Sequence, residues 1–339
     1  MLLVSSLTPS GRSWVLDSAA RTVGHERVVD LGSFAYPNDD VFDACAVFDD
    51  IASSVSITGA QFTSADLMAG LRSFRDVAAL VRVWEMHGTD EPRAVVWCAG
   101  LVPQMLADLQ ALDELADVAG TSSPAATLRA RLQPVLAAVR AGDIEWLFAT
   151  PAQPDAVQQA SLDVAAAVGM GATVRGVLVA PMPRKKDGWP KEIRGQARET
   201  YDRAVMDLHP ITTLRTRSGE APAFPAASMD AAQASTIVDA GGDRIFTLTL
   251  PGLSAIEYGP ANGGDIQQVH VGTWSADPAY PTTHVVVRFA EHTVRWEVDA
   301  TLRRCRAIDA VVADDTIAVT FVPVQEQWPS GRDQEEGGA

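Results

Sequence analysis

Short, continuous apolar runs, typical of strands buried on both faces of a parallel sheet, alternate with amphipathic stretches along the first 216 residues. The apolar runs lie at 1–5, 28–31, 94–98, 143–150, 174–179 and 210–214. In the amphipathic stretches, apolar residues recur at three- and four-residue steps, which predicts helices. These stretches lie at 13–24, 63–86, 103–140 (two segments, 103–118 and 124–140), 155–168 and 193–208. The alternation predicts an α/β domain over residues 1–216, a parallel sheet with flanking helices.

The pattern changes beyond residue 216. Residues 217–242 are rich in glycine, proline, alanine and serine, which predicts a linker. From 243 to 325 apolar residues occupy every second position of several short runs, as in strands with one buried face. This period predicts a small antiparallel β domain. The last segment, 326–339, is acidic and polar, and we expect a disordered tail there.

Composition narrows the classes of function. The chain has 339 residues and a net charge of −16, which argues against a nucleic-acid-binding protein. Cys45, Cys98 and Cys305 are too far apart in sequence for a zinc ribbon or a redox dithiol. The first residues lack the features of a signal peptide, and no apolar run is long enough for a membrane span. We therefore expect a cytoplasmic protein.

Four stretches carry a resemblance to a known family. They are 6–13 (SLTPSGRS), 95–106 (VVWCAGLVPQML), 175–181 (RGVLVAP) with Gln196 and 210–214 after it, and 246–252 (FTLTLPG). In order and spacing they resemble the arsenite-pump and tail-anchored-protein-targeting ATPases, the deviant Walker A class of P-loop proteins. The last stretch is similar to the small-heat-shock-like β domain that ends many bacterial members. The resemblance implies a P-loop fold, ATP or ADP with Mg²⁺, and a dimer with nucleotide at its interface.

The stretch that matches the phosphate loop keeps only part of its chemistry. Such a loop needs glycines, a lysine for the phosphate oxygens and a Ser/Thr hydroxyl for Mg²⁺. Gly11 and Ser13 are correctly spaced, but Arg12 stands in the place of the lysine and Leu7 in that of the second, family-specific lysine. Pro9 removes one backbone donor. Gly11, Arg12 and Ser13 are thus candidate cofactor-binding residues of a vestigial loop, and a plain strand–helix turn is the alternative.

Other positions of the family's site are altered too. Cys98 replaces the aspartate that supports Mg²⁺, and Ala180 replaces the asparagine that contacts adenine. No clear aspartate follows the second strand where the family's water-orienting residue lies. We therefore expect no catalytic residues, no metal site and at most weakened binding of ATP or ADP with Mg²⁺.

The leading functional hypothesis is a catalytically degenerate homologue of these ATPases, a pseudo-ATPase that acts as a binding or regulatory subunit. It would form a homodimer or a heterodimer with an intact paralogue. One alternative is an atypical but active ATPase that uses Arg12 and Ser13 to handle a client protein or an anion. Another is a client-binding module that works without nucleotide. The helices at 63–86 and 103–140 hold Met68, Met86 and Met105, which suit either a client surface or ordinary core packing.

Overall fold

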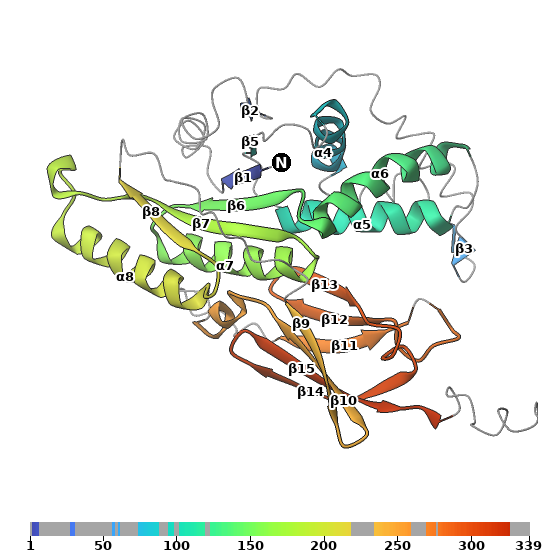
Figure 1. Ribbon diagram of the computed structural model, residues 1–339. Helices are drawn as coiled ribbons and strands as arrows, with labels where there is room; N and C mark the ends of the chain where they lie inside the picture. The colour runs from blue at the N-terminus through green and yellow to red at the C-terminus, as the bar shows by residue number, and fades with distance from the viewer. Residues whose placement is uncertain are drawn as a thin grey trace, which may run out of the picture.

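The computed structural model describes eleven stretches of the chain. They are residues 2–6, 28–30, 56–57, 60–61, 74–87, 94–97, 102–118, 123–217, 234–258, 269–275 and 277–325. The predicted phosphate loop, the residues 63–73 of the expected helix and the expected tail at 326–339 lie outside them. The fold class is as predicted: a parallel sheet with flanking helices, followed by antiparallel sheets (Figure 1).

The parallel sheet has six strands in the order β2–β5–β1–β6–β7–β8, and every neighbouring pair is parallel. The strands are β1 (Leu2–Ser6), β2 (Val28–Asp30), β5 (Ala94–Trp97), β6 (Glu145–Thr150), β7 (Thr173–Met182) and β8 (Thr213–Arg217). The helices are α4 (Phe74–His87), α5 (Val102–Val118), α6 (Ser123–Ala141), α7 (Pro154–Gly169) and α8 (Lys191–Asp207). A two-stranded ladder joins β3 (Ser56–Ile57) to β4 (Ala60–Gln61).

The C-terminal part stacks a four-stranded sheet, in the order β14–β15–β10–β9, with a three-stranded sheet, β11–β12–β13 (Figure 1). The strands are β9 (Ser235–Ala240), β10 (Asp243–Thr249), β11 (His270–Trp274), β12 (His284–Phe289), β13 (His292–Glu297), β14 (Cys305–Ala313) and β15 (Thr316–Pro323). The alternation predicted for β10 holds, because Phe246 and Leu248 are buried and their neighbours are not.

Two boundaries differ from those expected. Strand β9 lies inside the range 217–242 that we expected to be a linker, and it pairs along its whole length with β10. In β9, exposed apolar residues such as Val238 lie among short polar residues. The sequence of β9 therefore lacks the alternation of apolar and polar positions by which a strand is predicted. Strand β8 begins at Thr213 rather than at 210, because the backbone N–H of Ile211 donates to Leu208 O and closes the turn after α8.

Helix α7 connects the two parts of the molecule. Every residue from Ala160 to Gly169 is buried. The helix packs on β6 and β7 on one side, and on β13 and the 3₁₀ helix η6 (Leu253–Tyr258) on the other. A helix at a protein surface buries only one stripe, so burial on all sides marks α7 as an interior element. Buried residues of both parts accordingly form one continuous core.

Two glycines permit this close packing. A methyl group on Gly169 would come within 2.6 Å of Val294 Cγ1 and 3.2 Å of Leu250 Cδ2. Gly252 has a φ of +94°, and a side chain there would collide with the carbonyl of Ser161 on α7. Both positions therefore require glycine for steric reasons, and Gly252 also for its backbone conformation.

A buried pair of polar side chains crosses the same interface. Nε2 of His292, at the start of β13, lies 3.1 Å from Oδ1 of Asp163 on α7, and the two side chains are 5% and 2% exposed. The same carboxylate oxygen accepts a hydrogen bond of 2.9 Å from Gln159 Nε2. The His292 ring also lies edge-on to Phe289, with centroids 5.7 Å apart. Among the described residues, His292 Nε2 has no hydrogen-bond partner, so this contact is a close approach of two buried side chains and not a hydrogen bond.

Candidate functional site

The residues expected to bind nucleotide, Gly11, Arg12 and Ser13, lie outside the described residues. The strands that lead to the predicted site are described. Strands β1 and β5 are neighbours in the sheet, with Ser5 opposite Trp97. Both run in the same direction, so the chain leaves them at the same edge of the sheet. The next residues in sequence are Leu7 after β1 and Cys98 after β5.

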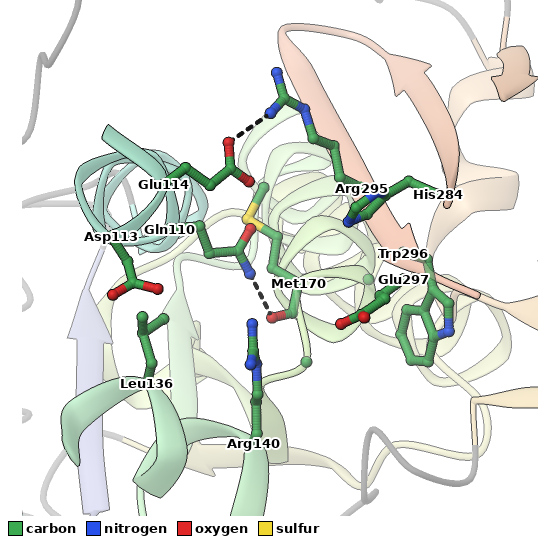
Figure 2. A pocket seen from close by; sticks show the side chains of 12 residues that line it. Gln110, Asp113, Glu114, Leu136, Arg140, Met170, His284, Arg295, Trp296 and Glu297 are labelled. Carbon is green, nitrogen blue, oxygen red and sulfur yellow. Dashed lines mark hydrogen bonds and ion pairs between the residues drawn. The ribbon is translucent and has the colours of Figure 1, made fainter. Parts of the chain in front are cut away.

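Among the described residues, a cleft of about 320 Å³ lies where the α/β part meets the β sheets (Figure 2). Helix α5 supplies Gln110, Asp113 and Glu114 on one side, and α6 supplies Leu136 and Arg140. The last turn of α7 and the residues just after it, Gly169–Gly171, form the floor. His284 of β12 and Arg295, Trp296 and Glu297 of β13 close the other side. The cleft thus exists only because two distant parts of the sequence pack together.

A side-chain hydrogen bond from α5 holds the floor of the cleft in place. Gln110 Nε2 donates to the backbone oxygen of Met170, at 3.1 Å, and so ties α5 to the end of α7. Gly171 has a φ of +87°, which turns the chain away from the helix toward β7. Figure 2 shows the Arg140 side chain pointing from α6 toward this turn. Among the described residues, none forms a hydrogen bond or an ion pair with its guanidinium.

Ion pairs close the rim. Arg295 Nη1 on β13 lies 3.1 Å from Glu114 Oε2 on α5, which joins the two walls directly (Figure 2). The same guanidinium lies over the ring of Trp274, 5.3 Å from its centroid. Glu297 is bound to Arg303 at 2.6 Å. These carboxylates are therefore neutralised by partners within the chain.

Burial shifts the pKa values of two groups in the cleft. It raises the pKa of Asp113, and the charges of Arg129 and Arg140 only partly offset this rise. It lowers the pKa of His284 in spite of the nearby carboxylates of Glu297 and Glu114. Burial thus favours the neutral form of His284, whose Nδ1 lies 2.9 Å from the hydroxyl of Thr283.

This arrangement suits binding better than catalysis. An available guanidinium, an amide and a half-buried carboxyl can orient a small polar ligand or a peptide side chain. None of the cleft residues is a serine or cysteine nucleophile beside a base. In the part of the chain that the structure describes, no group of three His, Cys, Asp or Glu residues could hold a metal ion.

A second cleft, of about 330 Å³, contains one residue that sequence analysis singled out. Gln196 lines it together with Thr200, Arg203 and Asp207 of α8, opposite the first turns of α7. The pKa of the Asp207 carboxyl is raised to about 6, chiefly by burial; the charge of Arg203 opposes this rise and that of Asp315 adds to it. Ala180, the position at which the sequence resemblance would place an adenine contact, is buried in β7 and is not among the residues that line this cleft.

Sequence reasoning did not find the first cleft. Its residues lie in two parts of the sequence, 110–171 and 284–297, that are more than a hundred positions apart. Each segment alone is typical of a helix or a strand with ordinary surface charges. Among the described helices, none is long and apolar enough to cross a membrane. Comparison of the chain with protein-family models and with curated proteins found no match.

Proposed function

We propose that this chain is a catalytically inactive relative of the arsenite-pump-type ATPases that serves as a binding or regulatory subunit. One observation carries the proposal. Strands β1 and β5 are parallel neighbours, so residues that follow them start from the same edge of the sheet. An active phosphate loop would need a lysine after the first strand and a carboxylate after the second. This sequence has Arg12 and Cys98 instead.

The physical reason is that phosphoryl transfer depends on positioning and on charge stabilisation. Loss of one major electrostatic contact costs about 3–4 kcal/mol of transition-state stabilisation, or a factor of about 100 to 1,000 in rate. Arginine keeps the charge of a lysine, but its planar guanidinium does not fit a loop that is shaped for a compact ammonium. A neutral thiol at Cys98 supplies no negative charge for a metal ion.

The test is steady-state release of phosphate from ATP, with Mg²⁺, by the full chain. We expect turnover at the level of the buffer control, and the same level for Arg12→Ala. Isothermal titration with ATP, with and without Mg²⁺, measures residual binding separately. Turnover above background that Arg12→Ala abolishes would instead establish the atypical active ATPase.

The proposal includes association, as a homodimer or with an intact paralogue, in the cytoplasm. Light scattering of the purified chain, alone and mixed with such a paralogue, measures this directly. A nucleotide-independent client-binding module is the second candidate, and the cleft between α5 and β13 is the observation that favours it. Retention of a bound peptide by the wild type, but not by Arg140→Ala, would support that candidate.

A further inference from the structure

The three lysines of this chain lie within seven residues of one another. They are Lys185, Lys186 and Lys191, and all other basic residues among the 27 are arginines. The segment that contains them joins β7 to α8. In Figure 1 it forms the turn at the left edge of the view, remote from the two C-terminal sheets. A chain that uses arginine everywhere else thus uses lysine at one peripheral turn.

The backbone of this turn is well defined. Residues Lys185–Asp187 form the 3₁₀ helix η4, which ends where the N–H of Gly188 donates to Lys185 O at 3.1 Å. Gly188 has a φ of +81° and reverses the chain. Pro190 then caps α8, and its carbonyl accepts the N–H of Arg194. Glycine on one side and proline on the other hold Trp189 at the tip of the turn.

The tip exposes a large apolar surface. Trp189 is 50% exposed and Ile193, on the first turn of α8, is 40% exposed. Trp189 occupies the position before the helix cap, where an apolar residue usually packs against one on the first turn. The corresponding helical position here is Arg194, so the indole has no apolar partner there. Its exposed face is available to an external surface.

The same tip is the positive end of an acidic molecule. Residues 184–198 contain six basic and two acidic side chains, whereas the whole chain carries −16. Among the described residues, none forms an ion pair with any of the three lysines, all of which are exposed. The N-terminus of α8, a helix of 17 residues, adds its partial positive charge. The electrostatic field of the molecule therefore orients this end toward an anionic surface.

We propose that the turn at 184–193 docks on anionic membranes, with Trp189 and Ile193 at the level of the lipid headgroups and Lys185, Lys186 and Lys191 over their phosphates. Tryptophan prefers the membrane interface, and lysine reaches phosphate with a flexible stem. Two features favour a lipid surface over an acidic protein. The turn lies at the periphery of the molecule, where an extended surface can reach it. Protein contacts with carboxylates favour the planar fork of arginine, which this chain uses elsewhere.

The experiment is co-sedimentation of the full chain with vesicles of phosphatidylcholine that contain about one third phosphatidylserine. We expect binding that falls with added salt and is absent from pure phosphatidylcholine. Each lysine contributes about fivefold to the partition coefficient, so the triple Lys→Gln variant should lose on the order of a hundredfold. Trp189→Ala should lose about tenfold.

Matched variants act as controls. Trp274→Ala removes another exposed tryptophan, on β11, and Arg288→Gln with Arg306→Gln removes exposed cations from the β sheets. All of these should bind vesicles as the wild type does, and circular dichroism checks that each variant is folded. Equal loss in the controls and in the tip variants would overturn the proposal, as would failure of the wild type to bind.

The position of the lysines allows a second readout. A lysine-specific endoprotease can cut this chain only after Lys185, Lys186 and Lys191. Anionic vesicles should protect the folded wild type from that protease and should leave cleavage after arginine in the β sheets unchanged. Protection by soluble polyglutamate but not by vesicles would overturn the proposal and identify an acidic polypeptide as the partner.

Discussion

At the scale of single residues, the two helical glycines Gly169 and Gly195 allow the same substitution to be tested in opposite environments. At Gly169 an added methyl group would press on Val294 and Leu250. We expect Gly169→Ala to destabilise the protein by about 1–3 kcal/mol, the usual cost of overpacking. Nothing lies within 4 Å of the position at Gly195 on α8, so Gly195→Ala should stabilise the protein by up to about 1 kcal/mol. Urea unfolding measures both, and a change of equal sign would contradict the packing described for α7.

Asp207 makes stability depend on pH. Burial raises its pKa to about 6 in the folded protein, above its ordinary value of 3.8. The folded state thus favours the protonated carboxyl group of Asp207. The stability that this preference contributes is lost as pH rises from about 4 through about 6. Asp207→Asn removes this loss, so it should be about 1 kcal/mol more stable than the wild type at pH 7, after allowance for screening in the cleft.

Measurement of unfolding free energy at pH 4 and pH 7 checks this prediction. The two proteins should differ little at pH 4, where the aspartic acid is largely protonated. Asp202→Asn, an exposed position on the same helix, is the matched control. An advantage of Asp207→Asn that is as large at pH 4 as at pH 7 would point to packing instead of charge.

At the scale of elements, α7 and α8 differ in burial although both are helices of similar length. Helix α7 is enclosed between two sheets, whereas only Ala197, Thr200, Ala204 and Asp207 of α8 are buried. We expect the amides of α7 to exchange with solvent only through global unfolding, and those of α8 through local opening as well. Native-state hydrogen exchange distinguishes these routes. Exchange of α7 at the rates of α8 would show that the two sheets separate readily.

At the scale of the whole molecule, the sequence predicts two domains joined by a linker at 217–242. In the structure, the two parts pack against each other through α7 and share one core. A cut between residues 218 and 233 breaks the covalent connection but leaves the contacts of α7 with β13 and η6. We expect the two fragments, produced at a protease site inserted there, to co-elute on size exclusion and to unfold in one transition. Separate elution without denaturant would show that each part folds alone.

The alternation of apolar runs predicted the parallel sheet, its helices and the change to antiparallel strands, since these depend on local periodicity. Helix α7 illustrates what periodicity leaves out. Its run of alanine and valine predicts a helix, but not that a second sheet covers its outer side. The cleft was missed for a similar reason, because Glu114 and Arg295 meet only in the folded chain. The candidate residues Gly11, Arg12 and Ser13 remain a prediction from sequence alone.

Helix α7 packs against both the parallel sheet and the C-terminal β sheets, and this has a consequence for synthesis of the protein. The ribosome completes α7 at residue 169, more than a hundred residues before it completes β13 at residue 297. At typical rates of elongation this interval is roughly ten seconds. Until Leu250 and then Val294 are made, the side of α7 that they later cover lacks these two contacts. The nascent α/β part therefore presents an apolar surface to the cell before the β sheets arrive to cover it.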